Sequence, residues 1–65
     1  MKKYQPTHKE IAHSMRRFGG SFVSSLGEAL LKADPDNAKR IKKAFPDYWK
    51  RYTKFAKRDF ATYKD

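Results

Sequence analysis

The sequence predicts an all-α protein, built as one small three-helix domain over residues 1–65. Apolar residues recur at steps of three and four, which is the spacing of one helix face, and no segment alternates as a strand does. Thr7 and Asp34 stand where helix N-caps are expected, and Pro35 and Pro46 interrupt the periodic segments. Together these signals indicate helices separated by short links.

The first helix is expected over about residues 8–33, after a flexible or extended arm at residues 1–6. Thr7 and Glu10 match a capping box, in which each side chain accepts a hydrogen bond from the other residue's backbone amide. The apolar residues that follow would lie within about 80° of one another on a continuous helix. They are Ile11, Met15, Phe18, Phe22, Leu26, Ala29 and Ala33.

Gly19 and Gly20 interrupt the middle of this stripe, and each glycine costs a helix about 1 kcal/mol relative to alanine. The stripe nevertheless keeps its phase across the pair, from Phe18 to Phe22 to Leu26. We therefore expect one long helix that bends at the glycines. The alternative is two helices hinged there.

A short second helix is expected over about residues 35–45, because Asp34 is a favoured N-cap and proline suits the first helical position. A third helix should follow over about residues 46–61, with Asp47 in its first turn, where a negative charge suits the helix dipole. Residues 62–65 form a tail. The aromatic side chains of the third helix should mostly pack against the first.

The core that this chain can build is small, because it has only three Leu, two Ile and one Val beside its ten aromatic residues. It has no cysteine, and His8 and His13 would lie on different sides of a helix, so we expect no disulfide, metal or cofactor. Self-association is the remaining way to stabilise so small a fold, and we expect a homo-oligomer. A tight helix crossing, within the chain or between copies, is predicted at small residues: Gly19, Gly20, Val23 and Gly27.

Residues 39–58 hold almost all of the excess positive charge, with nine basic residues and one acid for a net +8 of the chain's +9. Asp36 precedes Arg40, and Asp47 precedes Arg51, by the four residues that favour a helical ion pair. Seven cations are then left to attract an anion, unless they serve only to solvate the surface. They are Lys39, Lys42, Lys43, Lys50, Lys54, Lys57 and Arg58.

Two further sets of residues could contribute to an anion site. A base could stack on exposed aromatic side chains at the edge of the third helix. The candidates are Tyr48, Trp49 and Tyr52. A polar strip on the first helix could hold a phosphate, and it comprises Arg17, Ser21 and Ser24.

Catalysis finds little support in the sequence, because it has no cysteine, no close His–carboxylate pair and no carboxylate pair that a small core could desolvate. We therefore expect no enzyme and no catalytic residue. No apolar run follows the basic start or could span a membrane, so a cytosolic protein is expected.

The run FGGSFV at residues 18–23, Ala33-Asp34, and the run AFPDYW at residues 44–49 resemble a group of short phage and prophage proteins. The resemblance covers roughly residues 7–52 and brings no assigned activity. It implies a phage setting, and so the cytosol of the host cell. Very small basic or helical phage proteins often counter host defences, and one class sequesters cyclic nucleotide signals as non-catalytic homo-oligomers.

Three functional hypotheses follow from these features. The first is a non-enzymatic protein that binds an anionic nucleotide-type ligand and sequesters a host-defence signal. The second is a nucleic-acid-binding protein that contacts phosphate backbones with the same lysines. The third is an inhibitor that docks on an acidic host protein through its basic and aromatic surface.

Overall fold

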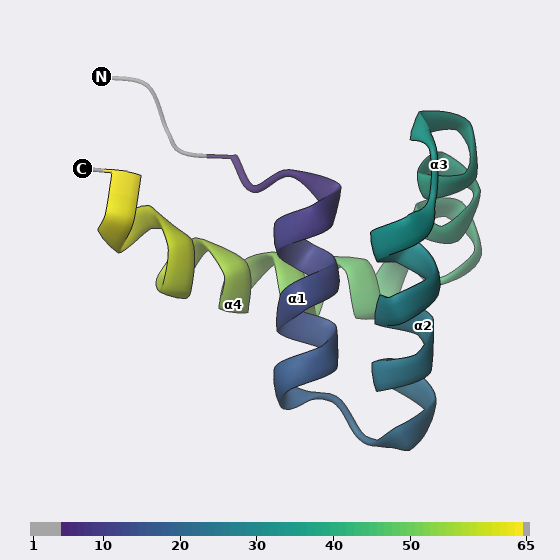
Figure 1. Ribbon diagram of the computed structural model, residues 1–65, viewed down its shortest axis with the longest axis horizontal. Coiled ribbons are helices and arrows are strands. Elements are labelled where there is room, and N and C mark those ends of the chain that lie inside the picture. The colour runs from purple at the N-terminus through teal and green to yellow at the C-terminus, as the bar shows by residue number, and fades with distance from the viewer. Residues whose placement is uncertain (1–4, 65) are drawn as a thin grey trace.

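The computed structural model describes the backbone of residues 5–64 and the side chains of residues 5–60. Within this part of the chain the fold is all-α, as predicted, but it has four helices rather than three. They are α1 (His8–Phe18), α2 (Ser21–Lys32), α3 (Pro35–Ala44) and α4 (Pro46–Lys64). The helices α1 and α2 run antiparallel and side by side, and α4 crosses behind them (Figure 1).

The predicted long helix over residues 8–33 is wrong, and the alternative of two helices hinged at the glycines is found. Gly19 has φ −83° and ψ 158°, and Gly20 has φ −71° and ψ −171°, so the backbone is extended at both. This link lets α2 turn back along α1. The phase of the apolar stripe from Phe18 to Phe22 therefore does not reflect a continuous helix.

The buried face of α2 also differs from the predicted stripe. Val23, Gly27 and Leu30 are buried against the rest of the chain, whereas Phe22 is exposed. A Cβ atom added to Gly27 would lie 2.7 Å from the Met15 Cβ. The small residues of α2 thus serve a close crossing with α1 inside the protomer.

The helix starts follow the local signals in the sequence. The capping box at Thr7 forms with both of its hydrogen bonds, at 3.2 and 3.0 Å. Phe45 separates α3 from α4, so Pro46 begins a new helix as expected. The last helix continues to Lys64, three residues beyond the predicted end, which places the predicted tail largely in the helix. Residues 1–4 of the predicted arm and residue 65 lie outside the described residues.

The N-cap of α3 allows the contribution of such a local signal to stability to be measured. The Asp34 side chain accepts a hydrogen bond from the Asn37 amide at 2.8 Å. We expect Asp34→Ala to lower the free energy of unfolding by about 0.5–2 kcal/mol, because it leaves that amide without its partner. Asp34→Asn keeps an acceptor at the cap and should cost less. Urea unfolding followed by circular dichroism measures both, and equal losses would contradict the role of the cap.

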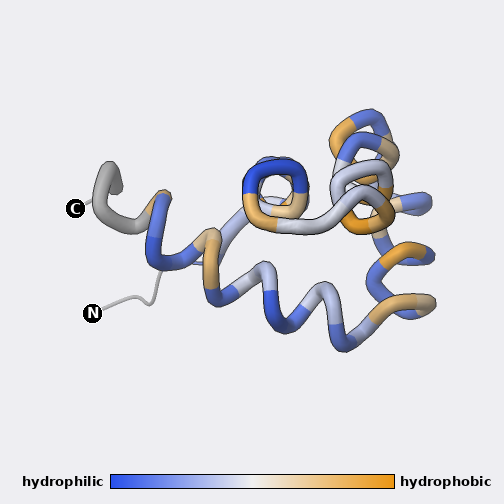
Figure 2. The backbone as a smooth tube through the Cα atoms, turned by 90° about the horizontal axis from the view of Figure 1, so that it is seen from below, coloured by the Kyte–Doolittle hydropathy of each residue, from blue (hydrophilic) through white to orange (hydrophobic). Residues whose placement is uncertain are grey.

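The core lies where α4 crosses the pair of α1 and α2. Its buried apolar residues come from all four helices: Ile11, Ala12, Met15, Val23, Leu30, Ala38, Tyr52 and Ala56. The turns of α4 that point away from α1 and α2 are hydrophilic (Figure 2). No helix in the described part of the chain is long and apolar enough to cross a membrane.

Candidate functional site: a lysine groove between two helices

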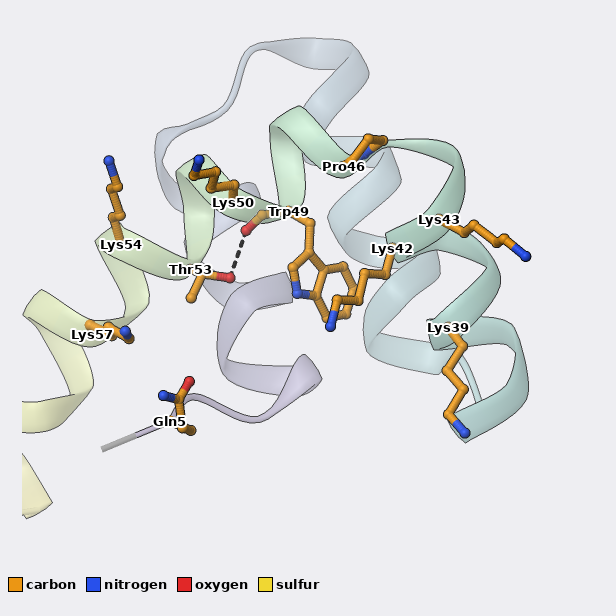
Figure 3. Close-up of a pocket in the computed structure, with 10 residues that line it drawn as sticks. All are labelled: Gln5, Lys39, Lys42, Lys43, Pro46, Trp49, Lys50, Thr53, Lys54 and Lys57. Atoms are coloured by element: carbon orange, nitrogen blue, oxygen red, sulfur yellow. Dashed lines mark hydrogen bonds between the residues drawn. The ribbon is translucent and has the colours of Figure 1, made fainter. Parts of the chain in front are cut away.

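A groove with a volume of about 770 Å³ lies between α3 and α4. Six lysine side chains border it, three from each helix (Figure 3). We call this site the lysine groove. Its lining consists of Gln5, Lys39, Lys42, Lys43, Pro46, Trp49, Lys50, Thr53, Lys54 and Lys57.

The link at Phe45 explains why two helices contribute to one groove. Because only Phe45 lies between the end of α3 and the start of α4, the two helices diverge from a shared corner. Lys50, Lys54 and Lys57 follow one another at steps of four and three, so they lie on one flank of α4. The chain thus gathers positive charge from both sides of the corner.

Trp49 forms an aromatic wall of this groove. Its side chain is partly buried and packs against the core. The Lys42 Nζ lies 5.8 Å from the centroid of the Trp49 ring, so a cation and an aromatic face lie together in the groove. The Thr53 hydroxyl donates to the Trp49 carbonyl oxygen at 2.6 Å (Figure 3). This bond engages the only hydroxyl among the groove's lining residues.

The groove has no acidic side chain in its lining. The ion pairs expected from Asp36 to Arg40 and from Asp47 to Arg51 are not formed among the residues that the structure describes. All six groove lysines are exposed. Like charges that line one groove repel one another, and an anion in the groove would relieve that repulsion. The arrangement therefore suits a ligand with several negative charges.

Other predicted site residues lie away from the groove. Tyr52 is only 5% exposed and belongs to the core, so it is not available to stack on a ligand. Tyr48 contacts Phe22 on another flank of α4. The Arg58 guanidinium lies over the Phe55 ring, 5.6 Å from its centroid. The lysine groove thus includes only some of the site residues predicted from the sequence.

The predicted strip of Arg17, Ser21 and Ser24 is also separate from the groove. Arg17 and Ser24 border a different pocket, of about 500 Å³, beside α1. Asp59 also lines that pocket, and its carboxylate would oppose an anion there. Ser21 begins α2 and is exposed.

The three glycines predicted to pack against a helix differ in how much space surrounds them. Added Cβ atoms at Gly19 and Gly27 would meet Val23 Cγ1 at 2.5 Å and Met15 Cβ at 2.7 Å, respectively. Gly20 is open, with no atom within 4 Å of an added Cβ. Gly27 and Val23 are therefore occupied within the chain, and a homo-oligomer, which stays a prediction, would need another surface.

Sequence reasoning missed three lining residues of the groove. Pro46 and Thr53 flank Trp49 on α4, and the helical spacing of Thr53 from Trp49 could have identified it. Gln5 lies in the segment before α1, and no sequence signal placed it beside α4. No residues of the described part form a group of His, Cys, Asp or Glu that could hold a metal ion. Comparisons of the chain with protein-family models, curated proteins and solved structures gave no significant match.

Proposed function

We propose that this protein binds a nucleotide-type ligand with two or more phosphates in the lysine groove, without transforming it. The observation that carries the proposal is that six lysines and one tryptophan line a single groove with no acid in its lining. Lysines attract phosphates as point charges, and an indole offers a face on which a base can stack. The groove volume of about 770 Å³ suits a ligand of that size.

The lysines and the tryptophan of the groove would have different tasks. The lysines of α3 and α4 would hold the phosphates, while Trp49 would select for a base. Lys42 lies beside the Trp49 ring, so a phosphate attracted by its ammonium group would bring the attached base close to the indole. Given the resemblance to short phage proteins, we propose that binding sequesters a nucleotide signal in the host cell.

Trp49 allows a direct test, because it is the only tryptophan in the chain and its emission reports on the groove alone. We expect ATP and a cyclic dinucleotide to quench this emission at saturating concentration, and inorganic triphosphate to compete with them but quench less. Stacking of a base on an aromatic side chain contributes about 1–3 kcal/mol. Trp49→Leu should therefore weaken ATP binding, measured by calorimetry, while changing triphosphate binding little.

The control for this experiment is Trp49→Phe, which keeps a ring and fills most of the space against the core. It should bind ATP more tightly than Trp49→Leu does. Circular dichroism would confirm that both variants are folded. Equal losses for ATP and triphosphate would contradict stacking, and absence of binding by any phosphate probe would contradict the proposed function.

A nucleic-acid strand is the second candidate, and the number of lysines favours it, since six cations exceed the charge of one nucleotide. The dependence of binding on salt separates the two candidates. For a single strand, the logarithm of the binding constant falls with the logarithm of salt concentration at a slope of about −0.7 per neutralised phosphate. A small ligand lacks the condensed counterions of a polymer and should give a shallower slope, whereas a strand that engages all six lysines should give about −4.

A further inference from the structure

The pocket of about 500 Å³ beside α1 lies where that helix packs against both α2 and α4 (Figure 1). We call it the α1 pocket. Its lining consists of His13, Ser14, Arg16 and Arg17 of α1, Ser24 of α2, and Asp59 and Phe60 of α4. None of these residues lines the lysine groove. A ligand in the α1 pocket would therefore be bound by a different set of side chains.

Ser14 is the buried residue of this lining, with only 1% of its surface exposed. Its hydroxyl oxygen has no hydrogen-bond partner among the described residues. Most buried hydroxyl groups in proteins have a partner, because an unsatisfied one has lost the hydrogen bonds that it made to water. A polar group that enters the pocket would supply the partner that the Ser14 hydroxyl lacks.

The α1 pocket also carries opposite charges that do not pair with each other. Arg16 and Arg17 lie on α1 and Asp59 lies on α4, and no ion pair joins them within the described residues. The Arg17 guanidinium lies over the Phe18 ring, 5.3 Å from its centroid. An arginine that packs on an aromatic ring can still donate hydrogen bonds from its N–H groups. Two cations and one anion thus border the same pocket.

We propose that the α1 pocket binds an acidic α-amino acid, a small molecule with two carboxylates and one ammonium group. The two carboxylates accept hydrogen bonds from Arg16 and Arg17, because the planar guanidinium matches the geometry of a carboxylate. The ammonium group pairs with Asp59. The Ser14 hydroxyl donates to a carboxylate oxygen and so gains a partner.

The mixture of charges in the pocket determines this class of ligand. Asp59 would repel a plain anion such as phosphate, and the two arginines would repel a plain cation. An amino acid carries both signs, and a second carboxylate matches the second arginine. The volume of about 500 Å³ is usual for a small-molecule site. This site goes beyond the proposed function, since it shares no residue with the lysine groove.

Titration of the full chain with three matched probes, followed by amide NMR, tests the proposal. We expect L-glutamate to bind more tightly than glutarate, which lacks the ammonium group, and than L-glutamine, which lacks the second carboxylate. Each preference should be about tenfold, the usual effect of one hydrogen bond to a charged group. The amides of Ser14, Arg17 and Asp59 should shift. Trp49 emission should not change, which separates this site from the lysine groove.

Asp59→Asn examines the contact with the ammonium group. It should abolish the preference for glutamate over glutarate, because it removes the charge that distinguishes the two probes. Asp36→Asn is the matched control, since it makes the same change at an exposed residue outside the pocket, and it should keep the preference. Equal binding of glutamate and glutarate by the unchanged chain would overturn the proposal, as would a preference that Asp59→Asn leaves intact.

Ser14→Ala examines the buried hydroxyl. It should weaken glutamate binding without lowering the free energy of unfolding, because the hydroxyl has no partner within the described residues to lose. Urea unfolding measures the stability of this variant, and the same NMR titration measures its affinity. Unchanged glutamate affinity in Ser14→Ala would contradict the proposed contact. Absence of amide shifts with all three probes at about 10 mM, where even a millimolar ligand is mostly bound, would overturn the site itself.

Discussion

Gly27→Ser is expected to destabilise the protein by about 1–3 kcal/mol, the usual cost of overfilling a packed core. An added Cβ would lie 2.7 Å from the Met15 Cβ and 2.8 Å from the Ala12 carbonyl oxygen. Both are atoms that a rotamer change cannot move away, and both residues are fully buried. The helices α1 and α2 must therefore separate, although serine is a better helix former than glycine. Each 1 kcal/mol lowers the melting temperature of a domain of this size by about 4–8 °C.

Gly20→Ser is the matched control, since it adds the same two atoms to the same chain. Nothing lies within 4 Å of a Cβ at Gly20, and the backbone there is already extended. Gly20 is also the N-cap of α2 and makes no side-chain hydrogen bond, whereas serine is a favoured cap. Thermal unfolding should thus show a loss at Gly27 and a small gain at Gly20. Equal effects at the two positions would contradict the close helix crossing.

The parts of the fold that the sequence predicted are those decided by neighbouring residues. Thr7 and Asp34 each satisfy an amide three residues ahead, and this interaction is the same in any tertiary context. The start of α4 at Pro46 follows from the fixed backbone of proline. Such signals placed three of the four helix starts without knowledge of the packing.

The helix break at Gly19 and Gly20 could not be decided locally. The four-residue step from Phe18 to Phe22 fits one turn of a continuous helix, and the same two residues can equally stand at the two ends of a link between separate helices. What distinguishes them is the contact of Gly27 with Met15, which lies twelve residues earlier in the chain. The hinge also leaves Phe22 exposed, which the predicted apolar stripe did not indicate.

The sequence predicted the lysines of the candidate site, but not which aromatic residue lies beside them. The charge of residues 39–58 indicated the lysines, and six of them do border one groove. The rotation of α4 about its own axis decides that Trp49 lines this groove while Tyr52 is buried in the core. That rotation is set by packing against α1 and α2, and the aromatic periodicity of α4 alone allows either residue to be the exposed one.

Reversing one charge on each wall of the groove, with Lys39→Glu and Lys54→Glu combined, should have the largest effect on ligand binding. A hydrogen bond to a charged group contributes about 1.5–3 kcal/mol. Loss of two such bonds to phosphate corresponds to at least about a hundredfold in the dissociation constant. Calorimetry with ATP measures this directly. Each wall belongs to a different helix, so the single variants should each show part of the loss.

The same double variant should lose ATP affinity without any loss in its free energy of unfolding. This combination distinguishes lysines that serve binding from lysines that stabilise the fold. The groove lysines repel one another in the free protein, and the carboxylate introduced by Lys54→Glu would face Lys50 and Lys57 one turn away. Lys9→Glu/Lys32→Glu is the matched control, since it also lowers the net charge from +9 to +5 but at residues outside the groove. If the control weakens ATP binding as much as the groove variant does, binding depends on net charge alone. The lysine groove is then not the site, because a true site must respond to where the charges lie.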